Sequence, residues 1–321
     1  MKQKRLLVSG ILAVGFALAG TQANAQQLII KGMYGMKAGT MAPPGLYAGM
    51  FGDFTWADEL KTPNGDTIHG PKLNEEIFGP LVMYVSNFKI LDANYAAVVG
   101  IPFANFRLDL PRLHDFSGST GIALSQLYVI PFSLGWHIKD PLPLSPGGAD
   151  IIFHYAFYAP TGRYTVLHTP NGPTTDPTNT SLGMWCNELA ARLTAFFDKD
   201  KAWHGSAALF YDINSKKQDL NWTTGNPFTF MGGLGRDYGG SDSLFSGWVG
   251  VTGYGQWQVT STTGADAPLA MRENKTTIYG VGPEFTTLKG ALTIRYFWEY
   301  GGKFSTQGPG LYVQFAMPLP F

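Results

Sequence analysis

Ionisable residues recur at alternate positions within stretches that are otherwise rich in apolar side chains. Glu188 and Arg192 stand four residues apart in one such stretch, and Arg295 and Glu299 stand four apart in another. Four residues of an extended strand span about 13 Å, so neither pair can bond within its own strand. Each charge must find its partner on a neighbouring strand. The charges would then either cross-link a wall or form a constriction that selects solutes.

Serine and histidine side chains could in principle carry out nucleophilic hydrolysis. A catalytic serine needs a histidine within hydrogen-bond reach and an orienting carboxylate or amide. The candidates are the serines Ser133 and Ser206 and the histidines His137, His154 and His204. None lies in a GxSxG motif, and an isolated inward histidine is more often a hydrogen-bonded wall residue. The sequence therefore favours a protein that is not an enzyme.

No motif predicts a metal or a cofactor. The histidines have neither HxxxH nor HExxH spacing. Asp176 stands alone among threonines and a proline, unlike the carboxylates of a calcium loop. Cys186, the one cysteine of the chain, cannot form an internal disulfide, and we interpret it as a small strand residue. We expect no metal site and no cofactor.

The alternation itself predicts β-strands that have one apolar and one mixed face. From Ala291 onward one face carries Leu292, Ile294, Tyr296, Trp298 and Tyr300, and the other carries Thr293, Arg295, Phe297 and Glu299. An arginine in lipid at mid-depth costs about 2–4 kcal/mol, so the mixed face must point inward. The stretch from Trp185 also contains good helix formers, but alternation fits it better than a helical period. Sorting the strands in this way predicts these lumen-lining residues: Glu188, Arg192, His204, Asp212, Trp248, Tyr254, Glu284, Arg295, Phe297 and Glu299.

The last strand shows the same pattern and ends the chain on an aromatic residue. Its apolar series is Leu311, Val313, Phe315, Met317, Leu319 and Phe321, and its inward series is Tyr312, Gln314 and Ala316. One face would meet lipid and the other a lumen, as in outer-membrane barrels. Pro318 and Pro320 both lack an N–H on the same side, so we expect the last residues to pair on one side only. A terminal Phe after such a strand resembles the signal read by the outer-membrane assembly machinery, which we expect to bind Phe321.

The start of the chain predicts export. Lys2, Lys4 and Arg5 precede an apolar run from Leu6 to Gly20, and Ala23-Asn24-Ala25 is typical of a cleavage site. We expect residues 1–25 to be a cleaved signal peptide, and residues 26–44 a periplasmic segment that lies below the barrel or reaches into its mouth. Residues 45–321 would form the barrel.

Composition agrees with a strand-rich, turn-rich protein. The chain has 40 glycines, 22 phenylalanines and 15 tyrosines, with only 14% charged residues. Without the signal, 20 basic residues stand against 23 acidic ones, which argues against nucleic acid as a partner. Long connections near 57–77, 106–121, 160–182, 214–225, 261–275 and 302–309 alternate with shorter ones. This rhythm predicts an all-β, antiparallel, up-and-down transmembrane barrel of about twelve strands, with ten or fourteen as alternatives.

Several segments resemble the phenol-degradation meta-pathway family of outer-membrane proteins. They are APPGLYAGMFGDF from Ala42, PFSLGWHI from Pro131, APTGRY from Ala159, NPFTFMGGLGRDYG from Asn226, GWVGVTGYGQWQVT from Gly247 and VGPEFTTLKGAL from Val281. The resemblance spans most of the mature chain and rests on the order and spacing of these segments. It implies a transporter-like barrel in the outer membrane of a Gram-negative bacterium.

Two functions follow from these observations. The first is a passive channel for small hydrophobic or aromatic compounds, because aromatic residues alternate with polar ones on the inward faces. The alternative is a barrel with an occluded lumen that serves a structural or lipase-like role. Outer-membrane lipids are expected partners in both cases.

Overall fold

The computed structural model describes residues 30–110, 116–169, 172–176, 178–240 and 243–320. The expected signal peptide and Phe321 lie outside the described residues. Among the described residues, no helix is long and apolar enough to cross a membrane.

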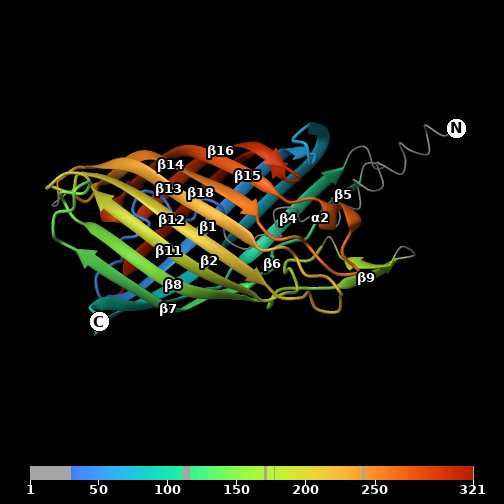
Figure 1. Cartoon of the computed structure of the whole chain (residues 1–321), viewed down its shortest axis with the longest axis horizontal. Coiled ribbons are helices and arrows are strands. Elements are labelled where there is room, and N and C mark those ends of the chain that lie inside the picture. Colours follow the sequence, from blue (N-terminus) through green and yellow to red (C-terminus); the bar gives the residue numbers. More distant parts are fainter. Residues whose placement is uncertain (1–29, 111–115, 170–171, 177, 241–242, 321) are drawn as a thin grey trace.

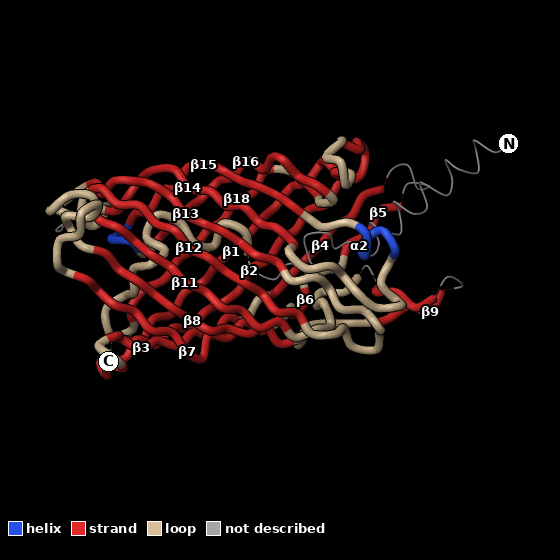
Figure 2. The backbone as a smooth tube through the Cα atoms, in the orientation of Figure 1, coloured by secondary structure: helices blue, strands red, loops and turns tan. Residues whose placement is uncertain are grey.

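Strands make up most of the described chain (Figures 1 and 2). The long ones are β1 (Gly45–Lys61), β2 (Thr67–Ile90), β3 (Ala93–Gly100), β4 (Phe103–Leu110), β7 (Leu127–Ile138), β8 (Ala149–Ala159), β11 (Cys186–Phe196), β12 (Trp203–Asn214), β13 (Pro227–Tyr238), β14 (Gly247–Gln258), β15 (Thr277–Thr287), β16 (Leu292–Lys303) and β18 (Pro309–Pro318). The short elements are β5 (Phe116–Ser119), β6 (Ala123–Leu124), β9 (Val166–Thr169), β10 (Gly172–Thr175), β17 (Thr306–Gln307), the helix α2 (Leu269–Glu273) and the 3₁₀ turn η1 (Leu288–Gly290).

Twelve strands close into one antiparallel barrel, which confirms the predicted fold and strand number. The order around the wall is β1, β2, β3, β7, β8, β11, β12, β13, β14, β15, β16 and β18, and β18 pairs with β1. Closure gives the wall strands a partner on each side, as the hydrocarbon interior of a membrane requires. The protein is therefore an outer-membrane β-barrel. By the rule that both chain ends of such barrels face the periplasm, the end where β18 finishes is the periplasmic one.

The hairpin of β1 and β2 corrects one expected connection. Residues 57–77 were expected to form a long polar loop, but strand pairing continues through them and only residues 62–66 connect the two strands. The hairpin stretches past the membrane zone, where both faces of a strand can meet water. Its backbone pairing therefore continues although the apolar alternation stops.

A break divides the third wall strand. β3 pairs with the half of β2 from Leu81 to Ile90, and β4 pairs with the half from Lys72 to Phe78. Beyond the break at 101–102, β4 pairs with β5 and β6, whereas β3 pairs with β7. The neighbours of this third strand are therefore β5 and β6 on the extracellular side of the break and β7 on the periplasmic side.

The two faces of the wall differ as the alternation predicts. Large apolar side chains are exposed outward on successive strands: Val82, Phe153, Leu189, Leu193, Leu209, Leu234, Val249, Val251, Phe285, Ile294, Trp298 and Tyr300. The intervening residues are buried inside the barrel. Residues 186–196 form β11, so the strand interpretation of that stretch is confirmed.

The end of β18 pairs on one side only, as the two prolines predict. Residues 310 to 318 pair with β1, whereas the last bond on the β16 side, within the described residues, is from Ala316 N to Ala291 O, at 2.9 Å. Leu319 N still donates to Leu46 O on the β1 side at 2.8 Å. The periplasmic rim therefore ends in a strand with one free side.

Two of the extracellular connections pack on each other. Leu220 and Trp222 from the β12–β13 connection pack on Ala267 and Met271 from the β14–β15 connection. We call this cluster of four residues the outer cap. It buries apolar side chains that would otherwise face water beyond the membrane.

Candidate functional site

The interior of the barrel is shared between its wall and the chain segment before β1. Residues 30–44, which we call the inner segment, run from the outer half of the lumen down to the periplasmic rim. Lys31 pairs with Glu299 in the outer half of β16. Lys37 pairs with Asp237 at 2.8 Å near the periplasmic end of β13, and Tyr47 at the start of β1 donates to Pro43 O at 2.7 Å. The inner segment therefore lies deep inside the barrel.

A socket in the wall holds the inner segment by one side chain. Met36 is fully buried. A Cβ atom added to Gly235 or Gly250 would lie 2.1 Å or 2.5 Å from its sulfur, and one added to Gly233 would lie 2.9 Å from its Cγ. Only glycines leave room for Met36 at this place in β13 and β14. We call these three glycines and the methionine the Met36 socket.

Polar side chains of the wall satisfy the backbone of the inner segment. Met36 N donates to Glu284 Oε2 at 3.0 Å, and Gly39 N donates to Thr194 Oγ1 at 2.9 Å. The carbonyl of Gly35 accepts the Ser206 hydroxyl, and the carbonyl of Met36 lies 3.3 Å from His204 Nδ1. An irregular chain inside a membrane barrel needs such partners, because its N–H and C=O groups have none of their own.

An arginine–glutamate pair joins the wall to the inner segment. Arg295 Nε donates to Glu284 Oε2 at 2.9 Å, and its Nη1 donates to Met33 O at 2.9 Å. Trp248 Nε1 donates to Glu284 Oε1 at 2.8 Å. The pair is almost completely buried, so its many hydrogen bonds are what offset the cost of desolvating both charges.

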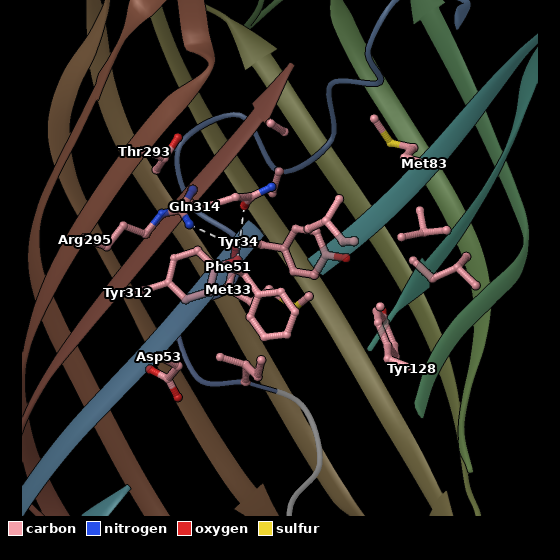
Figure 3. A pocket seen from close by; sticks show the side chains of 18 of the residues that line it. Met33, Tyr34, Phe51, Asp53, Met83, Tyr128, Thr293, Arg295, Tyr312 and Gln314 are labelled. Atoms are coloured by element: carbon pink, nitrogen blue, oxygen red, sulfur yellow. Dashed lines mark hydrogen bonds between the residues drawn. The ribbon is translucent and has the colours of Figure 1, made fainter. Parts of the chain in front are cut away.

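A cavity of about 870 Å³ remains between the inner segment and the opposite wall (Figure 3). The segment packs on β11 to β16, and the cavity is lined chiefly by β1, β2, β3, β7, β8 and β18. Apolar residues that line it are Ile30, Met33, Phe51, Ile77, Leu81, Met83, Val98, Phe106, Ile130 and Ile152. The lining begins at Ala291 and Pro318 on the periplasmic side and ends at Ser125, Thr180 and Leu182 among the extracellular connections. One cavity thus extends along most of the barrel.

All ten lumen-lining candidates point to the inside of the barrel, but they divide between two tasks. Arg192, Trp248 and Arg295 line the cavity. Five of the others support the inner segment: His204, Glu284 and Glu299 bond to it, Tyr254 OH donates to Glu299 at 2.6 Å, and Phe297 packs against Gly32. Their part in solute passage remains a prediction.

Glu188 and Asp212 belong to a buried polar cluster behind the cavity. They stand opposite each other on β11 and β12, and both are almost fully buried. Glu188 Oε1 lies 2.9 Å from His154 Nε2 and accepts Tyr128 OH at 3.2 Å. Arg192 stacks above Tyr34 of the inner segment, with Cζ 4.4 Å from the ring centre.

Sequence reasoning missed the residues contributed by the inner segment and by β1 and β2. Lys31 and Tyr34 reach the lumen from outside any strand, so alternation carries no signal for them. Asp53 and Glu75 lie on β1 and β2 with the parity of inward residues. Asp53 lies in a stretch whose alternation already predicted a strand, so sorting that strand by parity would have found it, whereas Glu75 lies in residues 57–77, which were expected to be a loop.

Ser206 and the three histidine candidates are bonded to other groups. The Ser206 hydroxyl donates to the inner segment, and His204 Nε2 lies 2.9 Å from Asp237 Oδ1. His137 Nδ1 lies 2.8 Å from Asp150 at the periplasmic end. Ser133 stands opposite His154 across β7 and β8, and His154 Nε2 is bonded to Glu188.

Comparison with known proteins places the chain in a family. The family model described as "Putative MetA-pathway of phenol degradation" matches residues 57–315, which is most of the chain. The chain belongs to this family. No curated protein matches it significantly in sequence.

Among solved structures, this chain is similar in fold to an outer-membrane channel from Pseudomonas putida F1. The TM-score is 0.64 at 13% identity, and the match covers 88% of this chain and 98% of that one. The β-domain of the Bordetella autotransporter BrkA matches with a TM-score of 0.45 at 12% identity, covering 87% and 100% of the two chains. A toluene transporter from Ralstonia pickettii matches with a TM-score of 0.37 at 10% identity, covering 87% and 90%. At 13% identity, the likeness to the Pseudomonas channel shows a shared fold and nothing more.

Proposed function

We propose that the protein is a passive outer-membrane channel for small hydrophobic or aromatic compounds, and not an enzyme. The observation that carries the proposal is the cavity of about 870 Å³, whose lining runs from the periplasmic rim to the extracellular connections. Its volume suits a small organic molecule, for which pockets typically measure about 300–1,000 Å³. The family description points to the same class of compounds.

The lining favours such solutes over bulk water. Apolar side chains of β2 and β3 face the cavity from one side, and Met33 and Tyr34 face it from the inner segment. Polar and charged groups are spaced along the path between them, among them Gln314, Thr293 and Arg295. A mostly apolar wall with isolated polar groups lowers the cost of desolvating an apolar solute.

Electrical recording tests this function in the full-length protein reconstituted in planar bilayers. We expect a small conductance that phenol-sized aromatic solutes interrupt, because they occupy the cavity. Leu81→Trp should remove both the conductance and the interruptions by filling the cavity. Val82→Trp is the matched control, because Val82 is the next residue of β2 and faces lipid.

Two results would contradict the proposal. A large, steady conductance that aromatic solutes leave unchanged would indicate a general porin. A complete absence of conductance, together with no binding of aromatic solutes, would favour the occluded barrel that the sequence left as an alternative.

A further inference from the structure

Carboxyl groups outnumber cationic groups in the outer part of the barrel interior. Three carboxylates, Asp53 of β1, Glu75 of β2 and Glu299 of β16, interact electrostatically with one cation, Lys31. Lys31 forms its ion pair with Glu299. Glu299 also accepts Tyr254 OH at 2.6 Å and Gly308 N at 3.0 Å. Both carboxylate oxygens of Glu299 therefore have hydrogen-bond donors, and its charge is neutralised by that of Lys31.

Among the described residues, Asp53 and Glu75 have no such partners. Both line the cavity and are only 7% and 5% exposed. Glu75 Oε1 is buried without a hydrogen-bond partner. Within the described part of the chain, no ion pair joins either carboxylate, and no hydrogen bond reaches Asp53. Figure 3 shows Asp53 beside the inner segment at the edge of the cavity.

The register of β1 and β2 brings the two carboxylates together. Asp53 stands opposite Ile77, and Glu75 stands opposite Thr55. They are therefore diagonal neighbours on the same inward face, with Cβ atoms about 7 Å apart. Two carboxylates at that separation can both contact one cation placed between them.

Buried carboxylates need compensation, and the cavity gives a cation access to these two. An unpaired buried charge costs several kcal/mol, so buried charges are normally paired. Phe51, Ile77 and Met33 adjoin them in the same cavity. An ammonium group attached to a small apolar body would satisfy the carboxylates and the apolar lining together.

We propose that Asp53 and Glu75 form a binding site for a monovalent cationic group inside the cavity. The group is either the ammonium of a small apolar amine or a free inorganic cation. The proposal rests on the proposed function only in taking the cavity as the route by which the cation arrives.

Calorimetric titration of the full-length protein in detergent with benzylammonium chloride tests the site. We expect the double variant Asp53→Asn/Glu75→Gln to bind benzylammonium at least tenfold more weakly, because both acceptors lose their charge. Benzyl alcohol, which has the same apolar body without the charge, should bind both proteins equally. Glu76→Gln is the matched control: Glu76 is the next residue of β2 and is already bonded to Asn105 at 2.8 Å. Each variant must first show the heat-modifiable gel mobility of a folded barrel.

Competition with potassium chloride distinguishes the two sources of the cation. Retained benzylammonium affinity in high potassium supports an amine site, and displacement by potassium supports an inorganic cation site. Equal benzylammonium affinity in the double variant and the wild type would overturn the proposal, because the two carboxyls would then hold only protons. Failure of the proposed function is a separate result: benzyl alcohol would not interrupt the current, whatever benzylammonium does.

Discussion

At the scale of single residues, the interior is organised by charges whose partners lie far away in the sequence. Lys31 and Glu299 are 268 positions apart, and Lys37 and Asp237 are 200 apart. In each pair the lysine belongs to the inner segment and the carboxylate belongs to a wall strand, β16 or β13. The buried charges thus position the inner segment and, through it, the shape of the cavity.

Arg295 joins the wall to the inner segment, because it pairs with Glu284 and donates to Met33 O. We expect Arg295→Met to lower the free energy of unfolding by about 3–5 kcal/mol, because Glu284 would remain buried without its cation. Urea unfolding of the barrel in lipid vesicles, followed by tryptophan fluorescence, measures this change. Arg236→Met is the control: Arg236 is exposed and its guanidinium lies over the Trp203 ring, 5.6 Å from the ring centre, so its loss should cost less than about 1 kcal/mol. Equal losses in both variants would contradict a special role for the buried pair.

The sequence predicts which residues point inward better than it predicts what they contact. Arginine and glutamate at alternate positions must avoid lipid, so parity alone placed Arg295 and Glu284 inside. Parity does not distinguish a residue that lines a cavity from one covered by the inner segment. Glu284 accepts the Met36 N–H, and no local sequence pattern around either residue predicts that contact.

At the scale of elements, the inner segment decides how much of the lumen is open. We expect Gly235→Val to enlarge the single-channel conductance, because a side chain there would fill the Met36 socket and displace the segment. The Cβ atom alone would approach the Met36 sulfur to 2.1 Å. Planar-bilayer recording measures the effect. Leu234→Val, which changes the lipid-facing neighbour, should leave the conductance unaltered.

An unchanged conductance in Gly235→Val would show that the other anchors hold the segment without Met36. Adding Lys37→Ala would then test the ion pair to Asp237 as the remaining periplasmic attachment. Both variants must retain the gel mobility of the folded barrel for the comparison to hold.

A lysine packed against the outer cap should make the stability of the cap depend on pH. Lys217 is buried against the Trp222 ring and donates to Leu182 O at 2.8 Å. Burial lowers the pKa of Lys217 from 10.5 to about 7. The opened cap therefore binds more protons than the closed cap between pH 7 and 10.5, so the cap gains stability as pH rises through this window. Below pH 7 the full cost of charging the buried amine is present.

Hydrogen-exchange protection of residues 217–222 measures this dependence. We expect protection to rise between pH 7 and pH 9 by up to about 1.4 kcal/mol per pH unit. Lys217→Met should raise protection at pH 7 and remove the dependence. Lys216→Met, a change at the exposed neighbour, should keep it. If the protection of the wild-type protein did not depend on pH, the Lys217 amine would be exposed to water.

At the scale of the whole molecule, the barrel wall was predictable and its contents were not. Strand alternation is imposed by lipid on one side and polar groups on the other, so twelve strands and their faces follow from the sequence. The β1–β2 hairpin was missed where it leaves the membrane, because water on both sides removes the reason for alternation. The sequence placed residues 26–44 only below the barrel or in its mouth, because the order of the inner segment comes from contacts with wall strands that are distant in sequence.

The membrane position of the whole barrel is itself testable at its outward face. Val251 lies near the middle of β14 and is 55% exposed, in a belt of similar apolar residues on neighbouring strands. If this belt meets hydrocarbon, Val251→Arg should lower the free energy of unfolding in vesicles by about 2–4 kcal/mol. Leu269→Arg offers the matched control, since Leu269 is equally exposed but begins the helix α2 among the extracellular connections. There an arginine meets water, and the expected change is within about 0.5 kcal/mol. If both variants lose about 2–4 kcal/mol, the membrane boundary lies beyond α2. If neither variant loses stability, the belt around Val251 does not contact lipid.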